Sequence, residues 1–415
     1  MTQVLVVGGG VIGLTSAWAL LEAGHRVAVV ERLATVAGGA SHANGGQLSY
    51  RYVSPLADEG VPLKALRWLL DPDGPLRFKP EASLHQWRWL ASFLARCRGP
   101  VNRATTARLL ALGAFSKQAF DELALQADLN AVQLRSPGKL VLYRNDGEFQ
   151  RVRARLADAG PEQALDRAAC LQLEPALAAG AAPLAGGIFT PGEAVADCQR
   201  LCLHLAERLR SHPRFDGLLQ AEALGFELGG GRVQALRSTA GRLPAEAFVL
   251  AAGLQSRALA APLGVRLPIY PLKGYSLTAP IGPDHRAPEV SVTDFEKKTL
   301  YARIGHQLRV AAMVDLVGEN ETIDPRRIAA LHRAVRELFP RAADYAQATP
   351  WAGLRPATPS GAPILGASPV AGLWLNVGHG ALGFTFSFAS ARILAELVSG
   401  RASPLALEGL TLQAA

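Results

Sequence analysis

Three glycines near the start of the chain, Gly8, Gly10 and Gly13, have the spacing that suits phosphate binding. An apolar run, residues 4–7, precedes them and is typical of a strand buried on both faces of a parallel sheet. The first glycine allows a tight turn, the second lets the backbone approach a pyrophosphate, and the third lets the helix pack closely against the strand. The amides at the start of that helix would then bind the phosphates.

An acidic residue follows where this chemistry needs one. Helical apolar spacing over residues 12–21, a capping Gly24 and a second apolar run, residues 28–30, complete a β-α-β pattern that ends at Glu31. A carboxylate there accepts hydrogen bonds from ribose hydroxyls and would repel a 2'-phosphate, which disfavours NADP. Strand, helix, second strand and acid together predict a dinucleotide site rather than an ordinary glycine turn.

Composition limits the remaining possibilities. The chain has 415 residues, 49% of them apolar and 19% charged, which predicts a folded protein with two domains that could be interleaved. Its net charge of +8 comes from scattered arginines, which argues against a nucleic-acid surface but leaves anionic substrates or lipids as partners. The four cysteines show neither a CxxC motif nor clustering with histidines, so we expect no metal site and no disulfide framework.

The sequence was also searched for segments that could contact a membrane. No apolar run approaches the ~20 residues of a membrane span, and no leader precedes the first strand. We therefore expect a cytoplasmic protein, with peripheral attachment to the inner face of the cytoplasmic membrane as an alternative. Residues 62–98 combine Trp68, Trp87 and Trp89 with several arginines. This pattern fits amphipathic helices with tryptophan in the core, which we favour, or a basic aromatic face on a membrane.

The elements that must position these residues show two kinds of strand pattern. Residues 245–253 form an apolar strand that runs into a turn of small residues, as expected where a nucleotide-binding sheet is completed. Residues 265–280 and 299–318 alternate in the manner of an antiparallel sheet and indicate a second domain. Residues 38–55 are rich in Gly, Ser and Asn and predict a long functional loop.

Five segments connect the chain with a known family: NGGQLSYRYVSP, DCQRL, YPLKGYSLT, GLRPATPSGAPILG and LWLNVGHGALGFT. With the β-α-β unit, they occur in the order found in bacterial FAD-dependent D-amino acid dehydrogenases of the small-subunit type, within the D-amino acid oxidase superfamily, which the chain resembles nearly from end to end. The resemblance implies an α/β plus α+β fold. A Rossmann-like FAD-binding domain (residues 1–56, 185–264 and 360–415) would be interleaved with a substrate domain (57–184 and 265–359) built on an antiparallel sheet with helices.

The resemblance also implies the cofactor FAD, bound non-covalently because no cysteine stands in a flavin-attachment motif. The amides of Gly383, Phe384 and Thr385 open the last expected helix. In the related fold such a helix end faces flavin N1 and the C2 carbonyl, where its dipole stabilises negative charge. The expected FAD-binding residues are Gly8, Gly10, Val11, Ile12, Gly13, Glu31, Arg32, Ser41, Asn44, Gly45, Gly46, Gln47, Leu48, Ala221, Ala252, Gly253, Gly380, Leu382, Gly383, Phe384 and Thr385.

Five residues are expected at the substrate. The resemblance places Arg355, in GLRP, on the substrate carboxylate, which a guanidinium binds through two parallel hydrogen bonds; a structural salt bridge is the alternative. Tyr52 and Tyr301 could hydrogen-bond the substrate, although Tyr301 could equally be a packing residue. Gln47 would line the same cavity. His379 could add to the positive field or only hydrogen-bond its own turn.

The implied reaction is the oxidative deamination of a D-amino acid. Hydride transfer to the flavin gives an imine, which water converts to a 2-oxo acid and ammonia, and the electrons pass to a quinone or another acceptor. An NAD-dependent dehydrogenase would share the β-α-β unit but would be colourless when purified. An amine oxidase or dehydrogenase for glycine, sarcosine or a proline derivative, on the same fold, also stays open. A non-catalytic flavin-binding subunit is the third alternative, and the intact Arg355 argues against it.

Overall fold

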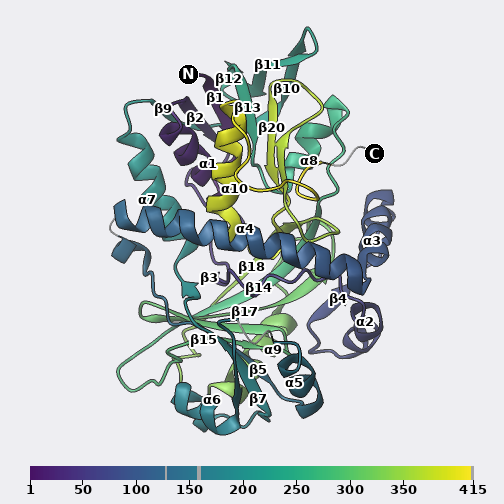
Figure 1. Ribbon diagram of the computed structural model, residues 1–415, viewed down its shortest axis with the longest axis vertical. Helices are drawn as coiled ribbons and strands as arrows, with labels where there is room; N and C mark the ends of the chain where they lie inside the picture. Colours follow the sequence, from purple (N-terminus) through teal and green to yellow (C-terminus); the bar gives the residue numbers. More distant parts are fainter. Residues whose placement is uncertain (127–128, 157–159, 413–415) are drawn as a thin grey trace.

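Two large sheets lie one above the other along the long axis of the molecule (Figure 1). The computed structural model describes residues 1–126, 129–156 and 160–412, and within them the larger sheets have six and nine strands. The long helix α4 (Gly99–Gln126) runs across the molecule between the two sheets, as Figure 1 shows. Any group bound between the sheets is therefore surrounded by residues from both.

The six-stranded sheet contains the predicted β-α-β unit. Strand β1 (Gln3–Val7) pairs in parallel with β2 (Arg26–Glu31) on one side and with β13 (Ala247–Leu250) on the other. Helix α1 (Val11–Glu22) connects β1 to β2, so the dinucleotide-binding pattern is confirmed. The remaining strands are β9 (Phe215–Gln220), β20 (Leu373–Val377) and β19 (Ile364–Ala367), in the order β19-β20-β13-β1-β2-β9.

Both faces of this sheet are covered, which explains why β1 reads as a continuous apolar run. Val4 and Val6 face a core formed with α1, α7 (Cys198–Arg210) and α10 (Gly383–Val398). Leu5 and Val7 face a second core, beneath the three-stranded sheet of β10 (Ala223–Gly229), β11 (Arg232–Ser238) and β12 (Gly241–Pro244) and the helix α8 (Gln255–Ala260). Successive side chains of a strand point to opposite faces, so each core receives every second residue.

The nine-stranded sheet is mainly antiparallel, as expected for the second domain. Its order is β18 (Thr349–Ala357), β14 (Tyr270–Pro280), β17 (Gln307–Leu316), β16 (Thr299–Ile304), β15 (Ser291–Asp294), β5 (Lys139–Tyr143), β7 (Gly186–Thr190) and β6 (Gln163–Asp166), with β4 (Leu76–Phe78) beside β17. Helix α9 (Pro325–Leu338) packs on one face of this sheet. The other face is turned toward the six-stranded sheet.

The pairing of β7 bears on the division into domains. The sequence-based division assigns residues 185–264 to the FAD-binding part, yet β7 pairs with β5 and β6 inside the nine-stranded sheet. The division stays a prediction, and this pairing favours a boundary after Thr190. The other short elements are β3 (Gln47–Leu48), β8 (Ala194–Val195), α2 (Val61–Leu70), α3 (Leu84–Arg96), α5 (Asp146–Arg153) and α6 (Arg167–Leu173).

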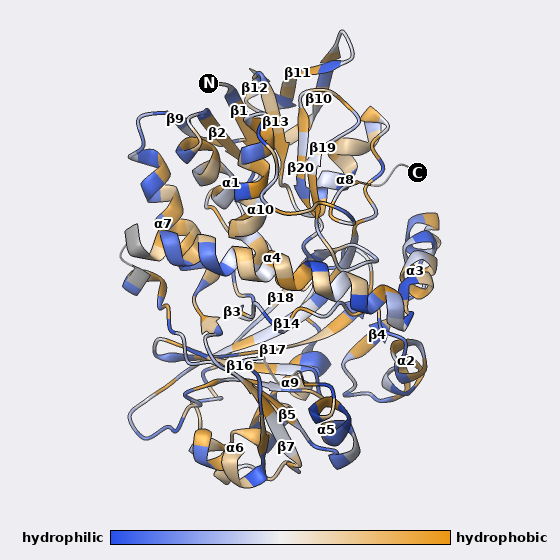
Figure 2. Cartoon of the chain, in the orientation of Figure 1, coloured by the Kyte–Doolittle hydropathy of each residue, from blue (hydrophilic) through white to orange (hydrophobic). Residues whose placement is uncertain are grey.

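One helical segment is long and apolar enough to span a membrane, whereas no such run was predicted from the sequence. By length and composition, the helical segment Gly380–Val398 could span a membrane, and 61% of its most apolar window is buried inside the protein. It contains α10, which packs against α1 and α4. Figure 2 shows hydrophobic colours on α10 and on the strands beside it. A helix that is apolar on every side is typical of a domain core as well as of a membrane span.

Candidate cofactor and substrate site

The glycine loop has the geometry expected of a phosphate-binding turn. Gly8 has a φ of +115°, and a Cβ there would lie 2.5 Å from the carbonyl oxygen of Ala251, just after β13. A Cβ on Gly13 would lie 1.8 Å from the Gly8 carbonyl oxygen. Helix α1 begins at Val11, whose amide donates to Ser41 Oγ at 3.1 Å. The loop therefore requires glycine at both positions, and Ser41 lies at the start of the helix.

Glu31 lies beside this loop at the end of β2. Its Oε2 accepts a hydrogen bond from the Gly9 amide at 2.7 Å, and its Oε1 accepts one from the Leu33 amide at 2.9 Å. Ala221, directly after β9, donates its amide to the Glu31 carbonyl oxygen at 2.9 Å. The structure thus brings Glu31 and Ala221 together with the glycines, whereas Arg32 is exposed on the surface.

The loop after β2 passes between the two sheets. A Cβ on Gly45 would lie 2.7 Å from Leu300 Cδ2, and one on Gly46, whose φ is +66°, would lie 2.3 Å from Ile304 Cδ1. Arg309, on β17, donates from Nη1 to the carbonyl oxygen of Asn44 at 2.6 Å. These contacts hold the segment 44–48 against the nine-stranded sheet, where both sheets can reach one ligand.

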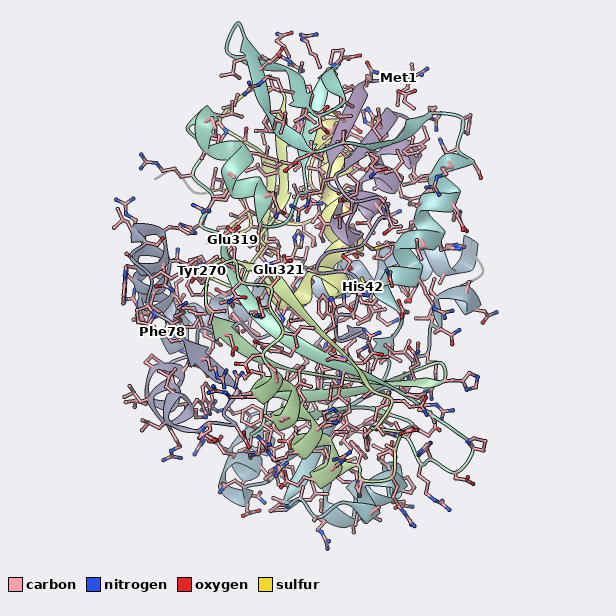
Figure 3. All side chains as sticks on the ribbon, turned by 180° about the vertical axis from the view of Figure 1, so that it is seen from behind. Met1, His42, Phe78, Tyr270, Glu319 and Glu321 are labelled. Atoms are coloured by element: carbon pink, nitrogen blue, oxygen red, sulfur yellow. The ribbon has the colours of Figure 1, made fainter. Side chains whose placement is uncertain are left out.

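The start of α10 completes the cofactor side of the site. Gly380, with a φ of +55°, and Leu382 lie in the turn before the helix, and Phe384 and Thr385 are buried in its first turn. Thr385 Oγ1 accepts from the Ser49 amide at 3.2 Å, which ties the helix start to the loop after β2. Figure 3 shows Tyr270, at the start of β14, and His42, in that loop, at the level where the sheets meet, far from Met1.

Arg355 on β18 is held by backbone alone. Its Nη1 donates to the carbonyl oxygen of Met313 at 2.8 Å, and it forms no ion pair with any described residue. A Cβ on Gly274 would lie 2.2 Å from Arg355 Nη2, so glycine leaves the room that the guanidinium occupies. Burial lowers the pKa of Arg355 to about 10, and the charge of Asp315 offsets part of this shift. The salt-bridge alternative is therefore not realised in the described part of the chain.

The backbone that holds Arg355 is itself unusual. Met313 has a φ of +74°, a left-handed conformation that costs a non-glycine residue on the order of 1 kcal/mol or more. The register between β14 and β17 shifts at this point, between Lys273 and Tyr275. Bulges of this kind redirect a backbone group or a side chain near ligand sites. Here the redirected group is the carbonyl oxygen that accepts from Arg355.

His379 lies close to Arg355 but carries no charge. Its backbone bridges Ala357, two residues beyond Arg355 on the same strand. Burial lowers the pKa of His379 to about 3, so the ring is neutral at physiological pH. A neutral ring adds nothing to a positive field, so this pKa shift favours the alternative in which His379 acts only through a hydrogen bond. Its Nε2 is buried and has no hydrogen-bond partner among the described residues, which leaves it for a ligand.

Tyr301 is not brought to this site. Its ring packs on Phe339 in the core beneath α9, and its hydroxyl donates to the Ala334 carbonyl oxygen at 3.3 Å. Its neighbours Leu300 and Ala302 point to the opposite face, toward the loop after β2. The structure thus realises the packing alternative for Tyr301, because adjacent residues of a strand face opposite sides.

Gln47 and Tyr52 meet a residue that the sequence analysis missed. Lys139, the first residue of β5, donates from Nζ to Gln47 Oε1 at 2.6 Å and to Ser49 Oγ at 3.0 Å. The same Nζ lies 4.5 Å from the centre of the Tyr52 ring. We call Lys139, Gln47, Ser49 and Tyr52 the Lys139 cluster. A lysine at the start of an otherwise apolar strand, KLVLY, was the signal that could have revealed it.

Comparison with known proteins gives a consistent result. Residues 3–397 match the DAO family, described as FAD dependent oxidoreductase. D-amino acid dehydrogenase 2 of Pseudomonas aeruginosa is 47% identical, with 98% of this chain and 97% of the relative covered. D-amino acid dehydrogenase 2 of Ralstonia nicotianae is 45% identical, with 97% of this chain and 98% of the relative covered.

Solved structures share the fold. Glycine oxidase from Geobacillus kaustophilus superposes with a TM-score of 0.77 over 100% of both chains, at 22% identity. L-proline dehydrogenase from P. horikoshii gives a TM-score of 0.76 over 99% of this chain and 96% of the other, at 15% identity. The predicted combination of a Rossmann-like domain with a second, sheet-based domain is confirmed.

The residues of this site also fit FAD, the expected cofactor. The glycine loop leaves no room for a Cβ at Gly8 or Gly13, and Glu31 lies beside it where a ribose needs an acceptor. The unpartnered His379 Nε2 provides a polar atom near the start of α10. Residues that cradle a dinucleotide, a family match over nearly the whole length and close relatives all agree. The chain therefore belongs to the DAO family of FAD-dependent oxidoreductases.

Proposed function

We propose that this protein oxidises D-amino acids to 2-oxo acids and ammonia. Bound FAD would accept the α-hydrogen of the substrate with its electron pair. The relatives named D-amino acid dehydrogenase, at up to 47% identity over nearly the full length, support this substrate class. The observation that carries the proposal is Arg355, a partly buried guanidinium without a carboxylate partner among the described residues.

Arg355 would bind and orient the α-carboxylate. Met313 occupies one N–H of the guanidinium, and the other donors are left for a ligand. A carboxylate held by two parallel hydrogen bonds has a fixed position and a fixed plane. This positioning is the main contribution the chain must make, because hydride transfer from a neutral amine depends on geometry more than on a general base.

Other residues would shape the rest of the site. Gln47 and Tyr52 would line the cavity around the substrate side chain. The amides at the start of α10 would stabilise negative charge near the cofactor, and neutral His379 would supply a hydrogen bond from Nε2. The FAD-binding residues named from the sequence keep their proposed roles, except that exposed Arg32 has no described contact that supports one.

Flavin reduction tests this function directly. Purified holoenzyme is mixed anaerobically with matched D- and L-amino acids, and the loss of flavin absorbance is followed. We expect D-amino acids to bleach the flavin and L-amino acids to leave it oxidised, because exchanging two groups at the α-carbon moves the hydrogen away from the cofactor once the carboxylate is fixed. Bleaching by L-amino acids alone, or by none of the pairs, would contradict the proposal.

We further propose peripheral contact with the inner face of the cytoplasmic membrane and a quinone as electron acceptor. Helix α2 has no buried residue, and Leu63, Leu66 and Leu70 are exposed at helical spacing. Lys64 and Arg67 are exposed beside them. Exposed leucines flanked by basic side chains are typical of helices that lie on anionic lipid. Figure 2 shows hydrophobic and hydrophilic residues mixed on α2 and α3 at one side of the molecule.

Co-sedimentation with vesicles tests the surface. Vesicles with phosphatidylglycerol should retain the wild-type protein, and Leu66→Glu with Leu70→Glu should release it. Leu224→Glu, at an exposed leucine on β10, is the matched control and should change nothing. Equal binding of the α2 variant would contradict the membrane proposal. For the acceptor, fast reoxidation of the reduced flavin by air with hydrogen peroxide as product, rather than by a quinone analogue, would identify an oxidase.

A further inference from the structure

Lys139, at the start of β5, is one of the buried cations of the nine-stranded sheet. Lys139 is 2% exposed, and its ammonium is held by two neutral oxygens, Gln47 Oε1 and Ser49 Oγ. An ammonium has three donors, so one remains after these bonds. The Tyr52 ring, whose centre lies 4.5 Å from Nζ, is itself 40% exposed. Lys139 is thus buried by its surroundings but bordered by a side chain that solvent reaches.

The hydrogen-bond partners of Lys139 are fixed in orientation. Gln47 donates from Nε2 to Ser291 Oγ at 2.5 Å, which turns its Oε1 toward Lys139. Ser49 donates its amide to Thr385 at the start of α10. Lys139 is therefore linked through single residues both to the sheet and to the helix end at the proposed cofactor site. A charge held this firmly loses little entropy when a ligand binds it.

The charge on Lys139 has no ion-pair partner. Among the described residues, none of the carboxylates forms a salt bridge with it, and a buried charge without a partner is costly. Glu193 is the carboxylate that acts on it electrostatically, while burial lowers the pKa of Lys139 to about 7. Glu193 Oε1 accepts from the Arg51 amide at 2.9 Å, and its Oε2 has no partner among the described residues. Burial raises the pKa of Glu193, which weakens it as a counter-ion.

We propose that Lys139 binds a carboxylate in the substrate side chain, so that the enzyme prefers acidic D-amino acids. This inference rests on the proposed function, in which Arg355 takes the α-carboxylate and Gln47 and Tyr52, two members of the Lys139 cluster, would line the cavity around the side chain. A carboxylate supplies both the missing acceptor and the missing counter-charge. A neutral amide supplies only the acceptor, and charge-assisted hydrogen bonds are roughly twice as strong as neutral ones.

Kinetics with three substrates test the preference. Holoenzyme is assayed with an artificial electron acceptor on D-glutamate, its neutral isostere D-glutamine, and D-methionine. The wild-type protein should have the highest kcat/KM for D-glutamate. Lys139→Met should lower that value by about 100-fold, mostly through KM, because a charged hydrogen bond is lost. The value for D-methionine should stay within about threefold, since its side chain makes no such bond.

Lys298→Met is the matched control. Lys298 is another lysine beside an aromatic ring, with Nζ 3.5 Å from the centre of the Phe295 ring, and burial lowers its pKa to about 8. It lies in the turn between β15 and β16, outside the Lys139 cluster. This control should leave the ratio of D-glutamate to D-methionine activity unchanged. Glu193→Gln should raise that ratio, because it removes the carboxylate that competes for Lys139.

Binding without turnover gives a second readout, which does not depend on catalysis. Titration of wild-type holoenzyme with glutarate and with pentanoate compares a dicarboxylate with a monocarboxylate of equal chain length. Glutarate should bind more tightly to the wild type, and this advantage should disappear in Lys139→Met.

Two results would overturn the inference: a wild-type enzyme that prefers D-glutamine or D-methionine to D-glutamate, or a Lys139→Met variant that loses activity equally on all three substrates. If the wild-type enzyme oxidises D-methionine normally, the proposed function still holds after either result. If no D-amino acid reduces the flavin, the proposed function itself fails. The two failures are therefore distinguishable.

Discussion

Arg327 on one face of the nine-stranded sheet, and Arg355 and Lys139 on the other, differ in what holds their charge. Beneath α9, Arg327 is fully buried and pairs with Asp315, and Tyr301 finds an acceptor in Ala334. On the face toward the six-stranded sheet, Arg355 and Lys139 are held by neutral oxygens only. Buried charges are normally paired, so a cation without a carboxylate partner is a candidate for binding a ligand. The face alone does not decide this, because Arg309, on the same face as Arg355, lies 3.8 Å from Asp197. Lys273, on the α9 side, is held by the Thr322 carbonyl oxygen.

Arg327 and Arg355 show this difference most clearly. Arg327 donates to both oxygens of Asp315 and from Nη1 to the Gly74 carbonyl oxygen at 2.7 Å, and Tyr275 donates to the same carboxylate at 3.2 Å. For Arg355, the Met313 carbonyl oxygen is the one acceptor found in the described part of the chain. We conclude that the first arginine serves the fold and the second is available for binding, a distinction that the residue type does not make.

Removing Arg327 should have the largest effect, and on stability. Arg327→Leu leaves Asp315 buried without its partner, which should lower the free energy of unfolding by about 3–5 kcal/mol. Denaturant unfolding measures this change. The double variant with Asp315→Leu should recover part of the loss, because no charge is then left buried. A change below about 1 kcal/mol would show that the pair contributes as little as an exposed salt bridge.

Arg355→Ala should damage activity and spare the fold. Loss of the charged partner of the substrate carboxylate typically costs about 2–5 kcal/mol, or roughly thirty- to several-thousand-fold in kcat/KM. FAD should stay bound, and the free energy of unfolding should not fall, since no carboxylate among the described residues loses a partner. Arg355→Lys should recover only part of the activity, because an ammonium lacks the planar fork. Near-normal kcat/KM with FAD bound would show that Arg355 does not bind the substrate carboxylate.

Substitution of Glu31 tests whether a carboxylate that already accepts hydrogen bonds from two backbone amides also binds the ribose of FAD. Glu31→Ala should weaken FAD binding by about 1.5–3 kcal/mol, because the ribose hydroxyls lose an ionised acceptor. Fluorescence titration of the deflavinated protein with FAD measures the Kd. Glu31→Gln, which keeps one oxygen acceptor, is the control and should lose less. An unchanged Kd in both variants would limit Glu31 to its contacts with the Gly9 and Leu33 amides.

Tyr301→Phe should have the smallest effect. It removes one hydrogen bond in the core beneath α9, worth about 1 kcal/mol of stability, and should leave kcat/KM unchanged. Tyr52→Phe is the comparison on the opposite face and should change kcat/KM if Tyr52 contacts the substrate. A tenfold fall in kcat/KM for Tyr301→Phe at unchanged stability would instead indicate that Tyr301 contacts the substrate.

The outcome for Tyr301 shows the limit of strand patterns. Alternation in residues 299–318 predicts strands, and β16 and β17 are present. Period-two alternation does not say which set of side chains faces a ligand, because both faces of this sheet are buried. Likewise, the apolar composition of Gly380–Val398 is compatible with a core helix and with a membrane span. Only the tertiary structure shows that α1 and α4 pack against this segment.

Local patterns were enough to predict the β-α-β unit and the position of Glu31, which depend on spacing within about thirty residues. The family followed from short motifs spread along the chain. Tertiary structure decided which charges are paired. Lys139 meets Gln47 across 92 residues, and Arg355 meets Met313 across 42. Strand order and register determine whether a cation lies beside a carboxylate. They also determine the burial of His379, which lowers its pKa. Such contacts between distant segments leave no local pattern from which they could be predicted.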